Sequence, residues 1–255
     1  MRVLFVAGEV APFSETTDAG RLLRVLPEAL QETRGVEPRI VMPRYGVVSE
    51  RRNRLHEVIR LSGSEIPVGD DSDTLRVKVA SIPGIRLQVY FMDSAKYFKR
   101  KGLHGLKKEG SVFEDNPARA LFFARAALET ARKLGWSPDV VHASGWIGAF
   151  VPHVLREAAD EELFASARTV YTPETIDGFE PVLSEAEAEA LGLPAHLGGQ
   201  SLRAIGLSTA DAAAYTPGDG PRTGEPEGPV LDESNAADAA ADLYAGLTPA
   251  ADLAA

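Results

Sequence analysis

Short apolar segments and amphipathic segments alternate along this chain, and the alternation limits the folds that it can adopt. Residues 2–7 form a short apolar run rich in Val and Leu, which is typical of a buried parallel strand. Apolar residues then recur at helical spacing over 19–33, and a second apolar run follows at 37–42. We therefore predict a strand–helix–strand unit with a right-handed crossover.

The alternation continues to about residue 216. Strands or extended segments are predicted at 56–60, 74–80, 86–92, 139–142, 168–172 and 211–216. Helices are predicted over 117–134, 146–158, 184–191 and 200–207. Ser184 and Glu187 have the spacing of a capping box at the start of the third of these helices. This order of elements indicates the α/β class, with a Rossmann-like, doubly wound and mainly parallel sheet that has helices on both faces.

The composition changes after Pro217. Residues 218–229 are rich in Gly, Pro and Glu and have no periodic apolar positions, so we expect them to be disordered. We divide the chain into a domain at 1–218 and an acidic Ala/Gly/Pro-rich tail at 219–255. Residues 234–247 have two interpretations, a transient alanine-rich helix or a docking peptide for a protein partner, and both stay open.

The charge of the chain is acidic and unevenly spread. The formal net charge is −10, from 37 acidic and 27 basic residues, and residues 219–255 carry seven of those ten net charges. The remaining domain is close to neutral, which disfavours binding to nucleic acid because phosphate contacts need a concentrated basic face.

Other function classes are disfavoured by what the sequence does not contain. No apolar run approaches the roughly 18 residues of a membrane span, and the first residues do not resemble a signal peptide, so we expect a cytoplasmic protein without membrane contact. The chain has no cysteine, which excludes disulfides and thiolate ligands. The histidines lack the close spacing of a metal site, and we expect neither a metal nor a cofactor.

Several motifs resemble those of one enzyme family, in the same order along the chain. The opening Arg2-Val-Leu-Phe-Val-Ala-Gly-Glu-Val-Ala-Pro-Phe-Ser14 resembles the first strand and loop of bacterial glycogen synthases and plant starch synthases, glycosyltransferase family 5. Further family-like segments lie at 43–46, 97–105, 115–123, 138–146 and 204–217. The resemblance implies the N-terminal-type domain of a GT-B enzyme, and no second alternating half follows in this sequence.

The departures from the family's pattern are concentrated at its phosphate-binding loop. That loop reads Lys-Thr-Gly-Gly-Leu-Gly-Asp in the family, whereas this chain has Glu15-Thr-Thr-Asp-Ala-Gly-Arg21. Glu15 reverses the charge of the family's Lys, and Thr17 and Asp18 bring side chains to positions where glycines let a diphosphate approach the backbone. We expect Asp18 to be the N-cap of the following helix, so that its carboxylate takes the place of the anion. Nucleotide sugar is therefore not expected to bind in the family's manner.

Two further motifs have lost family residues. In the family's His-x-His-Asp-Trp motif the second His and the Asp are replaced by Ser144 and Gly145. In its Thr-x-His-Asn motif the last two residues are replaced by Glu174 and Thr175. No catalytic residue is assigned, although a carboxylate at Glu174 could act as a general base if its pKa suited that role.

The resemblance also implies candidate sugar-binding residues, at positions where the family is expected to contact the glucan acceptor. These candidates are Glu9, Tyr45, Asp115, Asn116, His142 and Trp146. Structural roles compete with ligand binding at four of them. Glu9 could form a salt bridge or cap a loop, and Asp115 could cap the helix ahead of Pro117. His142 could be a hydrogen-bonded structural histidine, and Trp146 could belong to the core.

Three functions are consistent with this pattern. The first is a catalytically degenerate relative of the synthases, a pseudoenzyme of glycogen metabolism that binds an α-glucan or oligosaccharide or has a regulatory role. The second is a component of an active glucosyltransferase that needs a second chain, or that uses Glu174 and Glu9 in different chemistry. The third is a protein-interaction module that binds its partner through the acidic tail.

Overall fold

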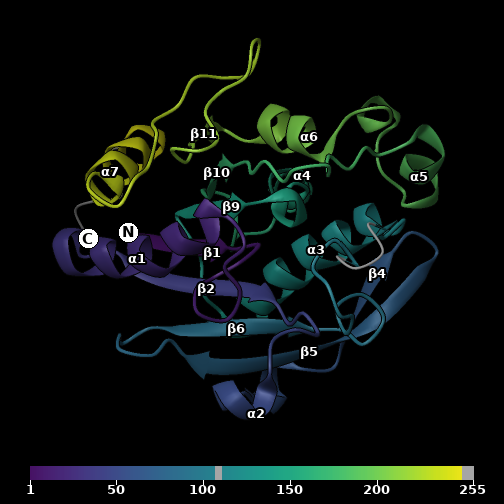
Figure 1. Ribbon diagram of the computed structural model, residues 1–255, viewed down its shortest axis with the longest axis horizontal. Helices are drawn as coiled ribbons and strands as arrows, with labels where there is room; N and C mark the ends of the chain where they lie inside the picture. The colour runs from purple at the N-terminus through teal and green to yellow at the C-terminus, as the bar shows by residue number, and fades with distance from the viewer. Residues whose placement is uncertain (107–110, 249–255) are drawn as a thin grey trace.

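The computed structural model describes residues 1–106 and 111–248, which form an α/β domain around one mixed sheet (Figure 1). The strand order is β11-β10-β9-β1-β2-β6-β5-β3, and β4 pairs with β5 outside this path. The parallel strands are β1 (Arg2–Val6), β2 (Glu37–Pro43), β6 (Gln88–Asp93), β9 (Val140–Ser144), β10 (Arg168–Thr172) and β11 (Ala212–Ala213). The antiparallel strands are β3 (His56–Glu57), β4 (Ser64–Val68) and β5 (Asp71–Ser81). A separate small hairpin joins β7 (Gly105–Leu106) and β8 (Ser111–Val112).

Helices cover both faces of the sheet, as the doubly wound pattern predicts. One face carries α1 (Asp18–Arg34) and α7 (Ala236–Leu247), which pack against each other. The other face carries α3 (Asn116–Leu134), α4 (Val151–Glu157) and α6 (Leu202–Thr209). Shorter helical segments are α2 (Glu50–Asn53), α5 (Glu185–Ala190) and single turns at Ile59–Leu61, Trp146–Gly148 and Ala195–Leu197. The predicted α/β class is therefore confirmed.

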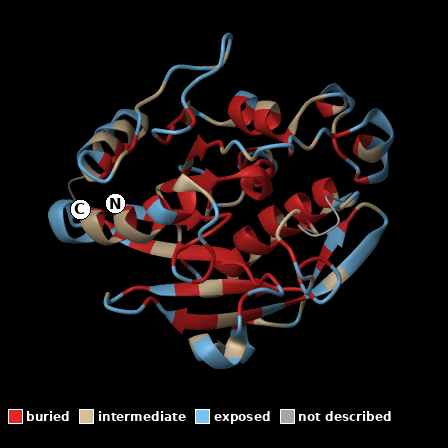
Figure 2. Ribbon diagram, in the orientation of Figure 1, coloured by how far each residue is buried: buried red, intermediate tan, exposed pale blue. Residues whose placement is uncertain are grey.

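The buried residues lie on the central strands and on the inner faces of the helices (Figure 2). Their apolar side chains form one continuous core. All five residues of β9 are buried, because this strand has β1 and β10 on either side and helices above and below. No helix of the part of the chain that the structure describes combines the length and apolarity needed to cross a membrane.

Most predicted elements are present, with differences in detail, and the strand predicted at 56–60 is reduced to His56–Glu57 followed by the helical turn Ile59–Leu61. The predicted strand at 168–172 coincides with β10, and the capping box of Ser184 and Glu187 is formed. The helix predicted over 146–158 is divided into a single turn and α4, and the last strand is much shorter than 211–216. Strand β4 was not predicted, and its edge position explains how it tolerates Pro67.

The segment that follows the predicted domain boundary is folded against the domain, in contrast to the disorder expected for residues 218–229, and the possible helix at 234–247 is formed as α7. Helix α7 packs along α1, with Ala236, Ala240 and Tyr244 buried at four-residue spacing. Composition alone suggests a disordered tail here. It does not reveal that these three side chains lie on one face of a helix and pack against the domain. Residues 249–255 of the expected tail lie outside the described residues.

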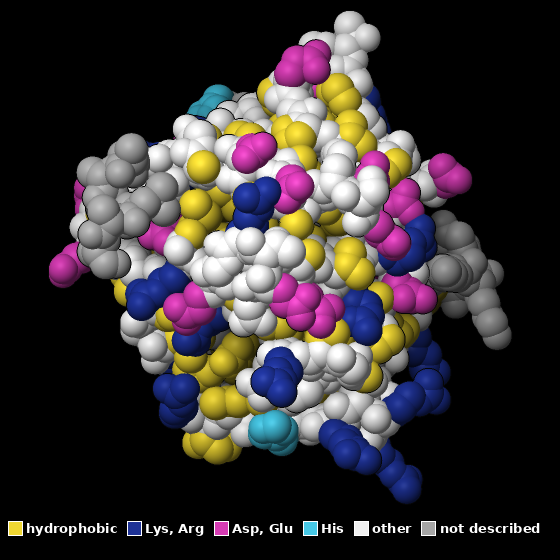
Figure 3. All heavy atoms as spheres, turned by 90° about the vertical axis from the view of Figure 1, so that its left-hand side faces the viewer, with side chains coloured by type: hydrophobic (Ala, Val, Ile, Leu, Met, Phe, Trp, Pro, Cys, Tyr) yellow, Lys and Arg dark blue, Asp and Glu magenta, His cyan; other side chains and the backbone are white. Residues whose placement is uncertain are grey.

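The acidic side chains of this segment therefore belong to a folded surface. Arg34 Nη2 on α1 lies 2.6 Å from Asp238 Oδ1 on α7. Figure 3, which faces the α1 and α7 side, shows acidic side chains in the upper half and across the middle, with Lys and Arg mostly in the lower half. Charges of both signs are thus exposed on this face.

A buried hydrogen-bonded chain ties α7 to the sheet. The Tyr244 hydroxyl lies 2.6 Å from His142 Nδ1, and His142 Nε2 lies 2.8 Å from the Thr172 hydroxyl. His142 sits on β9 between Phe5 of β1 and Val170 of β10 in the strand register. Burial lowers the pKa of His142 to about 3, so the ring is neutral at physiological pH.

We expect Tyr244→Phe to lower the free energy of unfolding by about 1–3 kcal/mol, because it leaves the buried His142 Nδ1 without a partner. Urea denaturation followed by circular dichroism would measure the change. The matched control is Tyr90→Phe, since the partly buried Tyr90 makes no hydroxyl hydrogen bond within the described residues. Equal stability losses in the two variants would contradict the assigned role of Tyr244.

Candidate ligand-binding site

Two adjoining hollows open at the carboxyl ends of the parallel strands, where open α/β sheets bind ligands. The first, here called the cleft, has a volume of about 310 Å³ and is lined in part by Trp146 and Phe179. The second, here called the acidic hollow, has a volume of about 360 Å³ and is lined in part by Thr17 and Asp219. Residues 174–177, which follow β10, line both.

The loop between β1 and α1 is organised around the carboxylate of Glu9. Glu9 is 5% exposed. It accepts hydrogen bonds from the Thr16 backbone N–H at 3.0 Å, the Thr16 hydroxyl at 2.8 Å and the Thr17 hydroxyl at 3.2 Å. The Ser14 hydroxyl also donates to it. Of the roles considered for Glu9, the structure therefore shows loop capping.

The start of α1 differs from the predicted one. Thr17 is the N-cap, and its hydroxyl accepts from the Gly20 backbone N–H at 3.3 Å, so the prediction that Asp18 caps this helix is wrong. Thr17 has the extended backbone of a capping residue, whereas Asp18 is already in the first turn. The Asp18 carboxylate pairs with Arg21 one turn later, and Glu15 is exposed.

Glu174 and Gly145, two of the departures from the family's motifs, meet in space. A Cβ atom at Gly145 would lie 2.6 Å from Glu174 Oε1, and Gly145 has φ 73° and ψ 170°, a conformation available almost only to glycine. The absence of a side chain at position 145 thus makes room for the carboxylate at position 174.

The Glu174 carboxyl group is held in an acidic environment. It accepts a hydrogen bond from the Trp146 backbone N–H at 3.1 Å. Burial and, secondarily, the negative charge of Glu9 raise the pKa of Glu174 to about 7. Glu174 therefore holds a proton at higher pH than an ordinary glutamate does, which suits it to exchange a proton near neutral pH.

Aromatic side chains line the inner part of the cleft. The Trp146 and Phe179 rings meet edge to face, with centroids 5.4 Å apart, and His104 stacks on Phe179 at 4.3 Å. The Arg119 guanidinium lies 5.3 Å from the Trp146 ring. Trp146 is only 6% exposed, so it combines a core position with a place in the wall of the cleft.

Asp115 and Asn116 line neither hollow. Asp115 occupies the N-cap position of α3 ahead of Pro117, as expected, but its side chain makes no cap hydrogen bond. Its carboxylate is instead held by two hydrogen bonds of 2.6 Å from Arg100. Asn116 is buried and accepts from Arg119 Nη1 at 2.6 Å. Burial lowers the pKa of Arg119 to about 10, which still leaves this buried guanidinium charged.

Tyr45 and His142 are also away from the two hollows. Tyr45 is 1% exposed and packs edge to face on Phe98, and His142 is enclosed between Tyr244 and Thr172. Of the six candidate sugar-binding residues, Trp146 thus lines the cleft, and Glu9 supports the loop beside it. No group of three or more His, Asp or Glu placed to hold a metal ion occurs within residues 1–106 and 111–248.

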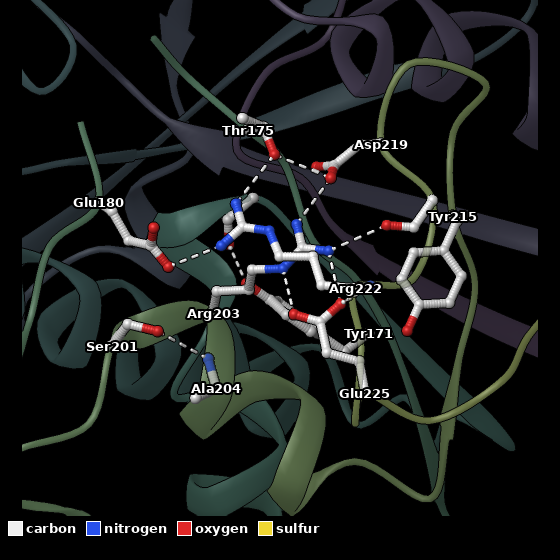
Figure 4. Close-up of polar contacts among 12 residues, drawn as sticks. Tyr171, Thr175, Glu180, Ser201, Arg203, Ala204, Tyr215, Asp219, Arg222 and Glu225 are labelled. Atoms are coloured by element: carbon white, nitrogen blue, oxygen red, sulfur yellow. Dashed lines mark hydrogen bonds and ion pairs between the residues drawn. The ribbon is translucent and has the colours of Figure 1, made fainter. Parts of the chain in front are cut away.

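A charged network that follows no recognisable sequence motif lies on the outer side of the cleft (Figure 4). Arg203 on α6 donates to Asp219 Oδ1 at 2.8 Å and to Glu225 through Nε and Nη2 at 2.6 and 2.7 Å. Arg222 donates to Glu180 at 2.9 Å and to the Thr175 hydroxyl at 3.3 Å. The one sequence feature that could have indicated this network is Arg203, the single charged residue in the otherwise uncharged segment 200–207.

Arg203 holds the segment after β11 against the wall of the cleft. Its side chain is 5% exposed and that of Asp219 is 9% exposed, so this ion pair is buried. The segment that appeared to be the start of a disordered tail therefore contributes to the site through Asp219 and Arg222.

Comparisons with known proteins agree with this architecture. A family model described as the starch synthase catalytic domain matches residues 2–203. The glycogen synthase of Chlorobium luteolum is 40% identical over 172 residues, which is 67% of this chain and 35% of that protein. The glycogen synthase of Chlorobaculum tepidum is 33% identical over 225 residues, 84% of this chain and 45% of the relative.

A solved structure shows the same fold. The catalytic domain of starch synthase IV from Arabidopsis thaliana, bound to ADP and acarbose, superposes with a TM-score of 0.66 at 21% identity, covering 84% of this chain and 44% of that one. The fold and the cleft at the strand ends thus define a domain of the GT-B glycosyltransferase type. The chain belongs to the starch synthase catalytic domain family, glycosyltransferase family 5. It spans 35–45% of the length of these two glycogen synthases.

We expect Arg203→Met to destabilise the fold by about 3–5 kcal/mol, because Asp219 and Glu225 lose their partner in a mostly buried network. Limited proteolysis should then cut the chain faster between residues 217 and 229. The control is Arg222→Met, whose pair with Glu180 is exposed and should contribute about 0–1 kcal/mol. Similar cleavage rates in both variants would show that Arg203 does not hold this segment.

Proposed function

We propose that this chain binds a neutral α-glucan or oligosaccharide in the cleft and does not itself transfer glucose from a nucleotide sugar. In this role it would be a catalytically degenerate, glucan-binding or regulatory member of its family. The observation that carries the proposal is the hydrogen bonding of Glu9, which takes up donors of the loop where relatives are expected to hold a diphosphate.

The electrostatics around this loop are unfavourable for a diphosphate. The Thr16 backbone N–H is directed to Glu9 and the Gly20 backbone N–H to the Thr17 hydroxyl, so neither is free for a phosphate oxygen. The carboxylates of Glu9 and Asp18 lie beside the same helix start. A phosphate anion would be repelled there, although a helix N-terminus otherwise attracts it.

The cleft has the composition of a saccharide site. Its aromatic walls, Trp146 and Phe179, offer apolar surface for the faces of sugar rings, and Glu180 and Arg222 at its rim supply hydrogen-bonding groups for hydroxyls. A concave, partly apolar site with a few polar groups is the general form of small-ligand pockets. Because the Arabidopsis structure holds both ADP and acarbose, both a nucleotide and a saccharide have to be tested.

Isothermal titration calorimetry with maltotetraose and with ADP-glucose would test the proposal. We expect maltotetraose to bind and ADP-glucose to show no heat of binding. Phe179→Ala should weaken maltotetraose binding about tenfold, equivalent to about 1.4 kcal/mol, because it removes an aromatic wall. The control is Val182→Ala, since Val182 is 52% exposed and does not line the cleft. Tight binding of ADP-glucose would overturn the proposal.

The pKa of Glu174 favours a second candidate, a component of an active glucosyltransferase. A carboxyl group with a pKa of about 7 is suited to general acid–base catalysis at neutral pH. Glu174 lines the cleft at its junction with the acidic hollow, so a bound sugar would lie near it.

Glucosyl transfer from ADP-glucose to glycogen, measured from pH 5.5 to 8.5, would distinguish the two candidates. If Glu174 acts as the general base, Glu174→Gln should lower the rate about 10²- to 10⁴-fold, and the rate of the unchanged chain should rise with pH through about 7 as the carboxyl ionises. The absence of turnover by the unchanged chain at every pH, or a Glu174→Gln rate equal to it, would exclude this candidate.

A further inference from the structure

Charge is separated along the strand order of the sheet. Residues 1–168 carry 25 basic and 22 acidic side chains, whereas residues 169–255 carry two basic and 15 acidic ones. The second stretch runs from β10 onward, and β10 and β11 lie at one end of the sheet, with β5 and β3 at the other. Figure 1 accordingly shows α5 and α6 in the upper part of the molecule and α2 at its lower end. The acidic side chains are therefore concentrated at one end of the molecule.

The end that carries α2 exposes cations that are not neutralised. Within the described residues, residues 47–60 have four exposed arginines without an ion pair, namely Arg51, Arg52, Arg54 and Arg60. Glu50 does not compensate them, because it is already paired with Arg44 at 3.0 Å and with Lys78 at 2.8 Å. The other acid of this segment is Glu57. We call the exposed surface of residues 47–60 the basic face.

The opposite end has a surface of the opposite charge around α5. Residues 180–190 contain four glutamates and neither Lys nor Arg. Glu187 is used in the capping box, and Glu180 has an ion pair. Glu185 and Glu189 are exposed and have no ion pair in the part of the chain that the structure describes. They are four residues apart on a helix and thus share one side of it. We call the exposed surface of residues 180–190 the acidic face.

Both faces also expose apolar side chains among their charges. Val47 and Ile59 lie in the basic face and Val182 in the acidic face, and Ile59 is 76% exposed. These are three of the five large apolar residues that are exposed among the described residues. One such side chain is ordinary on a protein surface. Protein interfaces, however, combine an apolar centre with a polar and charged rim, and both faces offer this combination.

We propose that the basic face of one copy of this chain docks on the acidic face of a second copy, so that copies associate head to tail. One such contact covers the unpaired arginines of one copy and the unpaired glutamates of the next. Nucleic acid or an anionic membrane would cover the basic face alone and would be repelled by the acidic end. Because the two faces differ, the contact is heterologous and leaves a free face at each end, to which further copies can add. This contact is independent of what the cleft binds.

The net charge of −10 opposes this association at long range. At about 0.1 M salt the Debye length is only about 10 Å, so the charges that face each other directly across the contact have the larger effect. Sedimentation equilibrium of the full chain at this salt concentration should give an average mass that rises with protein concentration above the mass of one chain. At about 0.5 M salt the mass should fall back toward that of one chain, because the opposite charges are then screened as well.

Two variants, each neutralised on one face, test the head-to-tail geometry. Arg51→Gln combined with Arg60→Gln should weaken self-association about tenfold, and so should Glu185→Gln combined with Glu189→Gln. Each variant keeps the face that the other has lost. An equal mixture of the two should therefore form a 1:1 complex that does not grow further, because neither outer end of that complex has an intact face.

The matched control is Arg86→Gln combined with Arg156→Gln, which removes the same charge at two exposed positions outside both faces and should leave self-association unchanged. An equal loss in this control would overturn the inference, because net charge alone would then explain the effect. A mass equal to that of one chain at every concentration in about 0.1 M salt would overturn it too, as would a mixture of the two face variants that forms no 1:1 complex. If the chain stays monomeric but binds vesicles containing phosphatidylserine, and Arg51→Gln with Arg60→Gln abolishes that binding, the basic face serves a membrane instead.

Discussion

The nearly buried carboxylate of Glu9 needs hydrogen-bond donors from the protein, and the geometry of the site depends on which groups supply them. A nearly buried charge at the end of a central strand is stable only with several hydrogen-bond donors. Glu9 obtains them from Ser14, Thr16 and Thr17, which draws the whole loop inward ahead of α1. Gly20 has to follow closely, since a Cβ atom at that position would lie 3.0 Å from Glu9 Cβ. The loop is therefore already saturated with internal contacts before any ligand arrives.

The same carboxylate connects the loop to the opposite wall of the site. The negative charge of Glu9 is one cause of the raised pKa of Glu174, and Asp219 contributes in the same direction. Acidic side chains that follow β1 and β11 therefore both act on Glu174, which follows β10, across the carboxyl edge of the sheet. Arg203 compensates the outermost of them and fixes the chain that follows β11. The fold and the charge of the site are consequently maintained by the same contacts.

Strand and helix positions were accessible from the sequence because burial imposes a regular spacing on each element. Residues 168–172 and the capping box at Ser184 are formed as predicted. The packing of α7 was missed because alanine at four-residue spacing looks like low complexity until its partner surface on α1 is known. The choice between Thr17 and Asp18 as N-cap was missed because both residue types cap helices well, and the pull of Glu9 on the loop decides between them.

The location of the site in the fold could be predicted from the sequence better than the residues that form it. The ends of the predicted strands correctly indicated the carboxyl edge of the sheet, and Trp146 lies in the wall of the cleft. Arg203 and Asp219 could not be found by pattern, because their importance comes from an ion pair between α6 and a Gly/Pro-rich segment. The contact between Gly145 and Glu174 is likewise invisible in the linear sequence.

That contact also limits which side chains positions 145 and 174 can carry together. With Glu174 in place, an aspartate at position 145 would collide with its carboxylate and would have to adopt a backbone conformation that only glycine accepts readily. Position 145 can therefore regain the aspartate of the family's motif only if Glu174 is replaced as well, so the residue tolerated at one position depends on the residue at the other.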